Sequence, residues 1–120
     1  MKVKRVVVES LEEFFSEVKD LVHKGEGKIE FISVGSIEEL NRILTPQRKR
    51  LLDVVKKYKP SSIRELAEKL GRDYRNVYDD VVFLERTGFL KLERRGKKLV
   101  PMVDYDAIDI QVRIGASLTE

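Results

Sequence analysis

Residues 61–101 read SSIRELAEKLGRDYRNVYDDVVFLERTGFLKLERRGKKLVP, and this segment holds the clearest pattern in the chain. Its first half has apolar residues at helical spacing over residues 63–70 and 74–87, which predicts two helices joined at Gly71 and Asp73. The side chains expected to face inward are Ile63, Leu66, Ala67, Leu70, Val77, Val81 and Leu84. The segment therefore predicts a helical pair with a shared apolar face.

The second half of the segment predicts a β-hairpin. Two runs suited to strands, Phe89–Glu93 and Lys98–Val103, flank the basic turn Arg94-Arg95-Gly96-Lys97. Upstream, Thr45-Pro46 is a strong helix start, because threonine caps and proline suits the first helical turn. That helix is expected to run to about Tyr58. The order is thus helix, helix, turn, helix, hairpin over residues 45–104.

This order and these residues closely resemble the winged helix-turn-helix superfamily. More narrowly, LTPQRKRLLDVV (44–55) and VPMVDYDAIDIQV (100–112) around the same unit resemble a family of small archaeal and bacterial transcriptional regulators, over Ser36 to Ile114. Some members of that family lie beside toxin genes as candidate antitoxins. The resemblance implies double-stranded DNA as the partner, with a toxin protein as a further candidate partner.

The charge distribution agrees with a nucleic-acid partner. Residues 45–104 carry 16 basic and 9 acidic side chains, net +7, whereas residues 1–44 and 105–120 are each net −2. A basic excess confined to one segment is the electrostatic footprint of phosphate binding. We therefore expect residues 45–104 to contact DNA.

The second helix of the pair would read bases from its outward face. At 100° per residue, Arg75 and Asp79 lie opposite the inward Val77. The candidate contacts on this helix are Arg72, Arg75, Asn76, Tyr78 and Asp79. Arginine pairs with guanine and asparagine with adenine, whereas Asp79 either accepts from cytosine or orients Arg75. Tyr74 is expected to lie in the core.

The hairpin supplies the second set of candidates. Four basic side chains surround its turn, namely Arg94, Arg95, Lys97 and Lys98. We expect them to contact phosphates, the alternative being a merely solvated turn. The carboxylates of Asp79 and Asp80 run against this pattern, because negative charge near phosphate weakens binding.

The flanking segments predict a small sheet and two helices. Strands are expected over Lys2–Glu9, Lys28–Val34 and Ala107–Ile114. A short helix is expected over Ile37–Leu44, with Ser36 as its cap and Glu39 at the capping-box position. Another helix is expected after Ser10, with an apolar stripe made of Leu11, Phe14, Phe15, Val18, Leu21 and Val22. We expect residues 1–44 and 105–120 to pair with each other and to form a homodimer.

Composition excludes several functions. The chain has no cysteine and one histidine, His23, so thiolate metal sites and the usual catalytic triads lack their residues. We expect no catalytic residues, no metal and no cofactor. No apolar run is long enough to span a membrane, so we expect a cytoplasmic protein without membrane contact. The 38% of charged residues is typical of heat-adapted proteins.

The sequence as a whole predicts an α+β fold, with a three-helix core, a β-hairpin wing and a flanking dimerisation element. The function it favours is a sequence-specific DNA-binding regulator, either an autoregulatory repressor or antitoxin-like. A different class stays open: a winged-helix module that binds protein, which Asp79-Asp80 and an exposed Val82 would favour. Little chain is left for a sensing domain, so we expect no small-molecule inducer.

Overall fold

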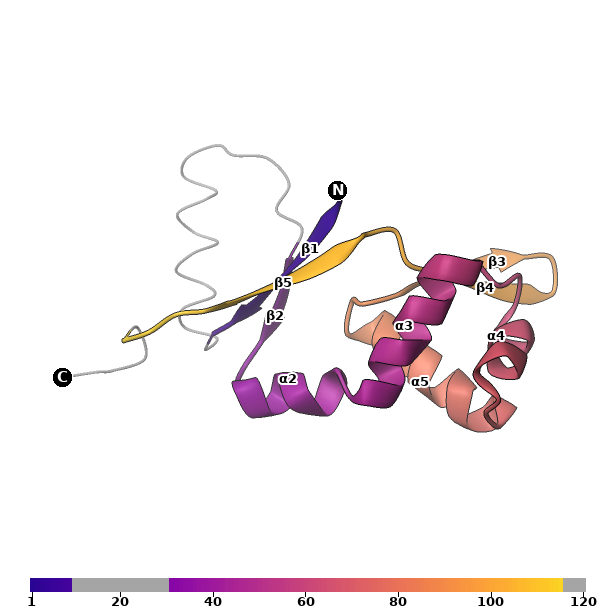
Figure 1. Cartoon of the computed structure of the whole chain (residues 1–120), viewed down its shortest axis with the longest axis horizontal. Coiled ribbons are helices and arrows are strands. Elements are labelled where there is room, and N and C mark those ends of the chain that lie inside the picture. The colour runs from indigo at the N-terminus through magenta and orange to yellow at the C-terminus, as the bar shows by residue number, and fades with distance from the viewer. Residues whose placement is uncertain (10–30, 116–120) are drawn as a thin grey trace. The chain divides into compact units, whose positions relative to one another are not determined.

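The computed structural model describes residues 1–9 and 31–115, which belong to two compact units. One unit combines Met1–Arg42 with Tyr105–Glu120, and the other is Ile43–Asp104. Figure 1 shows a sheet with one helix in the first unit, and three helices with a hairpin in the second. The helix expected after Ser10, His23 and the start of the second expected strand (28–30) lie outside the described residues.

The described strands of the first unit form a three-stranded parallel sheet. Its central strand β1 (Val3–Val8) pairs with β2 (Phe31–Val34) on one side and β5 (Ala107–Val112) on the other. The register sets Val6 beside Ile32 and Ile110, so these three side chains share a face. The second half of β1 is buried, which makes it the core of this unit.

Helix α2 (Ile37–Ile43) begins at the expected serine cap. The Glu39 amide donates to Ser36 Oγ over 3.1 Å, and the Glu39 carboxylate accepts from the Gly35 amide over 2.9 Å. Both hydrogen bonds satisfy amides that a helix start would otherwise leave without a partner. The predicted cap is therefore confirmed, with Glu39 reaching one residue further back than a standard capping box.

Three helices form the core of the second unit: α3 (Pro46–Tyr58), α4 (Ile63–Leu70) and α5 (Tyr74–Arg86). Thr45 caps α3 by accepting from the Arg48 amide at 3.2 Å, as predicted. The side chains buried between the helices are Leu51, Leu52, Val55, Ile63, Leu66, Ala67, Leu70, Val77, Val81 and Leu84. Every inward position predicted in the helical pair is thus confirmed, each larger side chain contributing roughly 1.5–3 kcal/mol by burial.

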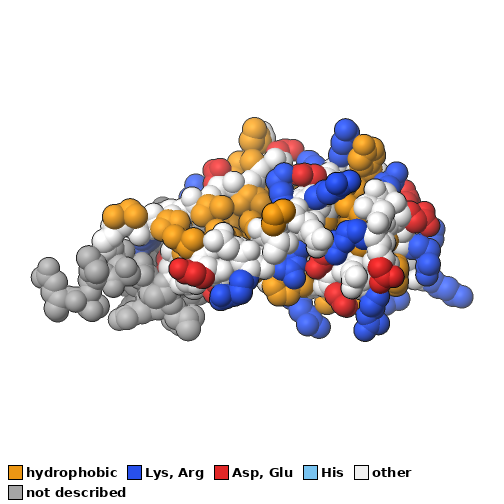
Figure 2. Space-filling model, turned by 60° about the horizontal axis from the view of Figure 1, so that its bottom comes forward, with side chains coloured by type: hydrophobic (Ala, Val, Ile, Leu, Met, Phe, Trp, Pro, Cys, Tyr) orange, Lys and Arg blue, Asp and Glu red, His pale blue; other side chains and the backbone are white. Residues whose placement is uncertain are grey.

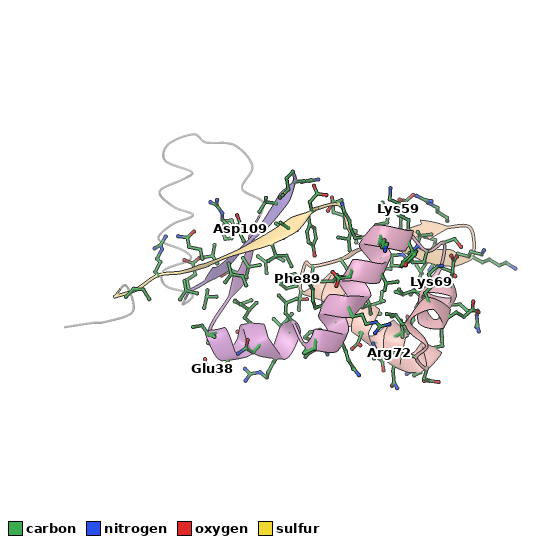
Figure 3. The ribbon with its side chains drawn as sticks, in the orientation of Figure 1. Glu38, Lys59, Lys69, Arg72, Phe89 and Asp109 are labelled. Carbon is green, nitrogen blue, oxygen red and sulfur yellow. The ribbon has the colours of Figure 1, made fainter. Side chains whose placement is uncertain are left out.

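The hairpin starts later than the sequence pattern predicts. Strands β3 (Lys91–Arg95) and β4 (Lys98–Met102) pair antiparallel, with Arg95 opposite Lys98. Phe89 and Leu90 precede β3 and are buried, so their apolar character reflects the core and not a strand (Figure 3). The turn is only Gly96-Lys97, and Gly96 has φ 62°, which suits the first position of a type II′ turn. The strands therefore carry Arg94 and Arg95 that were expected in the turn.

Helix α3 ends on a backbone feature of its own. Lys59 adopts the left-handed conformation at φ 48°, and its amide donates to the Val55 carbonyl over 3.1 Å. A side chain in this region carries a steric cost that glycine avoids. Pro60, which follows, is fully buried and turns the chain toward α4. Figure 3 labels Lys59 at this end of α3.

The second unit is a winged helix-turn-helix, and the chain as a whole is α+β. The α4 and α5 helices form the helix-turn-helix, with Gly71 at φ 64° ending α4, and the β3–β4 hairpin is the wing. Within residues 1–9 and 31–115, no helix is long and apolar enough to cross a membrane.

Candidate nucleic-acid interface

The outer face of α5 keeps two charged side chains open to solvent. Arg75 and Asp79 are 80% and 63% exposed, and their side chains pair across one helical turn at 3.6 Å. Asn76 is exposed beside them, and Tyr78 is half-buried. Four of the five candidates assigned to the recognition helix therefore lie on the accessible side of α5, whereas Arg72 precedes that helix. Of the two alternatives for Asp79, the orientation of Arg75 is the one that this ion pair supports.

Arg72, the fifth candidate, is held in a different network. Its guanidinium donates to one oxygen of Asp80 at 2.9 Å, and Arg48 donates to the other at 3.2 Å. The side chains of Arg72 and Asp80 are only 22% and 15% exposed, at the junction of α4 with α5 (Figure 3). Arg48 also lies 4.2 Å from the ring centre of Phe83. The network fixes α3 against α5.

This network changes the meaning of the two adjacent aspartates. Asp80 points inward and is neutralised by Arg48 and Arg72, so only Asp79 faces outward. Val82 is half-buried and offers little apolar surface. The two features that favoured a protein-binding module are therefore largely absent from the outer face of α5.

The prediction that Tyr74 lies in the core is wrong. Its side chain is 40% exposed. Because Tyr74 is the first residue of α5, it projects past the end of the apolar layer, although its angular position faces inward. Its ring lies 4.9 Å from the Arg64 guanidinium carbon and 6.1 Å from the Tyr78 ring. The tyrosine thus joins α4 to the outer face of α5.

Tyr74 and Arg64 line a surface hollow between α4 and the wing, which we call the wing cleft. The cleft measures about 370 Å³ and is lined by Ser62, Ile63, Arg64, Tyr74, Lys97, Lys98 and Leu99. It contains three cationic side chains and no carboxylate. Ser62, Ile63 and Arg64 lie at the start of α4, so the positive pole of that helix lies at the cleft. The cleft is therefore suited to an anion.

The four wing candidates are all exposed. Lys97 and Lys98 line the wing cleft, whereas Arg95 pairs with Glu93 at 3.1 Å. On the face shown in Figure 2, many Lys and Arg side chains lie on the surface of the winged helix-turn-helix unit. The structure thus brings two of the wing candidates together with the N-terminus of α4 and the start of α5.

The sequence patterns did not identify Arg64 as a candidate DNA contact, because its helical spacing indicates only an exposed position on α4. The signal that could have indicated it is its place in the first turn after the Ser62 cap, where a cation lies beside amides that bind anions. Tyr74 could have been found from its place at the helix start.

The start of α4 is held by a carboxylate. Glu65 Oε2 accepts from the Ser61 hydroxyl at 2.6 Å and from its amide at 3.0 Å, while the Glu65 amide donates to Ser62 Oγ. The two hydrogen bonds from Ser61 lower the pKa of Glu65 below its ordinary 4.5, and the charges of Lys69 and Lys98 lower it further. The carboxylate is therefore ionised at neutral pH and fixes the helix end that borders the cleft.

The described residues contain no group of three or more side chains suited to holding a metal ion.

Comparisons with known proteins identify a family and give a distant similarity among solved structures. The sequence model of the HVO_A0114 family matches residues 43–110. No curated protein matches the chain. Among solved structures, it is similar to a MarR-like transcriptional regulator from Thermotoga maritima, at 20% identity and a TM-score of 0.46. The similarity covers 79% of this chain and spans 65% of that protein, and it is too distant to transfer a function.

Proposed function

The chain belongs to the HVO_A0114 family, and we propose that its winged helix binds duplex DNA as a transcriptional regulator. The observation that carries this proposal is the wing cleft, which joins Lys97 and Lys98 to Arg64 and Tyr74. Three cations at a helix N-terminus, with no carboxylate among the lining residues, match the oxygens of a DNA backbone phosphate. The net charge of +7 over residues 45–104 supplies the longer-range attraction.

A phosphate held in the cleft would bring α5 toward the major groove. The exposed first turns of α5 then offer Arg75 and Asn76 to base edges, with Asp79 holding the Arg75 guanidinium in one orientation. Tyr78 follows on the same side. Arg72 keeps a different role in this proposal, because its bond to Asp80 anchors the helix that carries the readers.

The finer assignment that we propose is a repressor. A winged helix that occupies a promoter blocks transcription by its presence alone, whereas activation needs a surface that contacts the transcription machinery. The outer face of α5 offers little surface for such a contact beyond the DNA readers.

We also propose that two chains associate through the sheet unit. β5 lies at the edge of the described sheet, and Ile110 and Val112 are exposed on it. An open strand edge with apolar side chains favours pairing with another chain. Two half-sites would then supply the specificity that one winged helix lacks.

The test is a footprint on the full chain. A short random-sequence duplex is titrated into isotope-labelled protein, and amide shifts are followed by NMR. We expect saturable, salt-sensitive shifts at the start of α4, in the first turns of α5 and at Gly96-Lys97. Shifts that avoid these three places, or the absence of binding at low salt, would contradict the proposal and favour a protein partner.

A further inference from the structure

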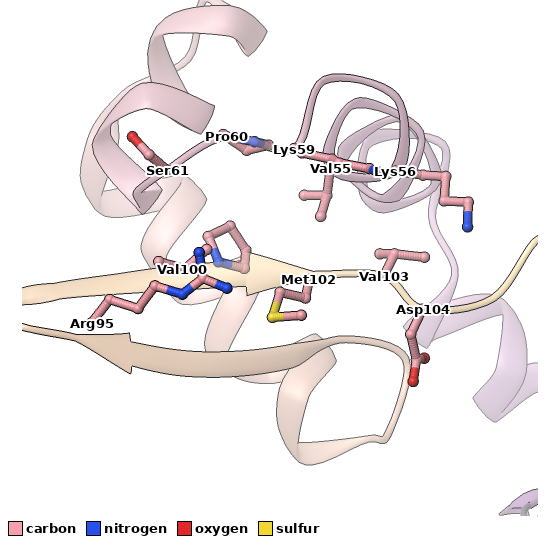
Figure 4. A pocket seen from close by; sticks show the side chains of 11 residues that line it. Val55, Lys56, Lys59, Pro60, Ser61, Arg95, Val100, Met102, Val103 and Asp104 are labelled. Atoms are coloured by element: carbon pink, nitrogen blue, oxygen red, sulfur yellow. The ribbon is translucent and has the colours of Figure 1, made fainter.

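Tyr74 lies at the boundary between the wing cleft and the outer face of α5. It is the first residue of the helix, and it lines the cleft together with Lys97 and Lys98. The next residue, Arg75, is already on the outer face. A second hollow of the winged unit is formed by the end of α3, the following loop and the hairpin, and α5 contributes no lining residue to it (Figure 4). Tyr74 therefore connects the proposed phosphate site with the helix proposed to read bases.

The ring of Tyr74 is held by neighbours from two helices. The guanidinium carbon of Arg64, on α4, lies 4.9 Å from the ring centre. The ring of Tyr78, one turn later on α5, lies 6.1 Å away, with an angle of 37° between the two ring planes. Both distances are within the ranges of favourable cation–π and aromatic pairs. A ring that is already held in this way loses little conformational freedom when it contacts a ligand.

The ring of Tyr74 nevertheless leaves apolar surface open to solvent at the start of the recognition helix. Tyr74 is 40% exposed, and Tyr78 beside it is half-buried. The major groove of B-DNA presents hydrogen-bond donors and acceptors on its base edges, and one apolar group, the 5-methyl of thymine. Among the groups on the base edges, this methyl is the one that an aromatic ring contacts without leaving a polar group unpaired.

We propose that Tyr74, supported by Tyr78, contacts the 5-methyl of a thymine and makes the protein prefer thymine at that position of its site. The methyl lies on the major-groove edge of the base, on the side of its own strand. A phosphate of that strand bound in the cleft by Arg64, Lys97 and Lys98 brings the methyl toward the tyrosine ring. This inference rests on the proposed function and adds to it the base that the start of α5 recognises.

The methyl contact separates thymine from uracil, because the two bases differ only in the 5-methyl group and pair with adenine in the same way. Deoxyuridine in place of thymidine therefore removes the contact and keeps the base pair. A buried methyl group contributes an amount of binding energy that corresponds to a factor of about four in affinity. Each thymine that meets a Tyr74 ring is expected to show a difference of this size.

The test starts from a duplex that the full chain selects from a random-sequence pool. Each thymidine of this duplex is replaced singly by deoxyuridine, and fluorescence anisotropy measures the affinity. We expect one thymine in each half-site whose replacement weakens binding about fourfold. If the protein binds the selected duplex and no single replacement weakens binding, the inference is overturned while the proposed function stands. If the chain binds no duplex even at low salt, both fail together.

Three variants assign the thymine preference to one ring. Tyr74→Ala removes the ring and is expected to bind the thymidine and deoxyuridine duplexes equally well. Tyr74→Phe keeps the ring without its hydroxyl and is expected to retain the fourfold difference. Tyr58→Ala is the matched control, because Tyr58 is 54% exposed and lies 5.0 Å from Lys69 Nζ, but belongs to α3 and does not line the wing cleft. This control is expected to retain the difference.

Two results with these variants would overturn the role of Tyr74. The first is a difference between the two duplexes that persists in Tyr74→Ala, since another side chain would then contact the methyl. The second is a Tyr74→Phe variant that loses the difference, because the hydroxyl and not the ring would then make the contact. The melting temperature of each variant without DNA separates a lost contact from a lost fold, and Tyr74→Gln replaces Tyr74→Ala in the test if the alanine variant unfolds.

Discussion

Arg75 is the side chain on which base recognition depends most in the proposed complex. It is the most exposed cation at the start of α5, and Asp79 limits its freedom by an ion pair at 3.6 Å. Because the pair is well exposed, it orients the guanidinium more than it stabilises the fold. Recognition and folding are therefore separable at this position.

We predict that Arg75→Ala weakens binding to the preferred duplex by roughly 1–3 kcal/mol and relaxes the preference at one base pair. Fluorescence anisotropy on the preferred site and on random duplex measures the effect. Arg86→Ala, at the far end of the same helix, serves as the control and is expected to have little influence on preference. An equal loss on both duplexes would make Arg75 a phosphate contact.

Asp80 is expected to matter for stability instead of recognition. Its carboxylate bridges Arg48 and Arg72 in a largely buried position. Asp80→Asn removes the charge between two guanidinium groups, and we expect it to lower the free energy of unfolding by about 1–3 kcal/mol. Asp79→Asn is the matched control. A chemical denaturation series in which both variants lose the same stability would contradict this role.

The residues that sequence patterns located correctly are those whose position depends on helical periodicity. Val77, Val81 and Leu84 are buried as predicted, since a core layer repeats every turn. Tyr74 and Arg72 depend instead on where α5 begins and on what lies across from them. Periodicity within one helix contains no information on either, so the aromatic wall of the cleft and the Asp80 network could not be predicted.

At the scale of elements, the start of α4 connects the fold to the proposed phosphate site. Hydrogen bonds among Ser61, Ser62 and Glu65 hold the first turn of α4, a helix of 8 residues. That end of the helix borders the wing cleft. A loosened first turn would misplace Arg64. The cap is therefore expected to influence both stability and binding.

We predict that Glu65→Gln lowers the melting temperature near neutral pH, because the carboxylate accepts two hydrogen bonds from Ser61. Since folding lowers the pKa of Glu65 below 4.5, its stabilising contribution is present above that pH and is lost as pH falls through the folded-state pKa. The difference between the two chains should therefore shrink in acid. Glu68→Gln is the control, and a difference that persists at acidic pH would contradict the assignment.

Element boundaries were harder to predict than element types. Each helix and strand that falls on described residues exists, but the wing begins at Lys91 and not at Phe89. Phe89 and Leu90 look like strand residues in sequence because a buried core position and a strand favour the same side chains. Only the partners across the fold distinguish the two.

At the scale of the whole molecule, the charge divides between the two units of the chain. The basic excess lies in residues 45–104, and the segments that form the sheet unit are net acidic. A unit that is repelled by phosphate and has an open, apolar strand edge is better suited to association than to DNA contact.

We predict that the full chain is a dimer at micromolar concentration and that deletion of residues 107–120 gives a monomer or an aggregate with weaker operator binding. The deletion removes β5 and its exposed edge. Ile110→Lys keeps the strand and places a charge on its apolar face, so it is expected to weaken the dimer without removing the strand. Light scattering measures the mass in solution. A full-length protein with the mass of one chain, 14.0 kDa, would refute the proposal, and so would a truncated chain that stays dimeric.

The most direct test of DNA binding through the wing is the salt dependence of affinity for a random duplex. Replacing Arg94, Arg95 and Lys97 by Ala should flatten the slope of log affinity against log salt by about 0.9 for each lost phosphate contact. A variant with Arg50, Lys57 and Lys69 replaced by Ala loses the same charge from α3 and α4 and should retain a steeper slope. An unchanged slope in the wing variant would contradict a DNA-contacting wing. So would a slope that flattens equally in both variants.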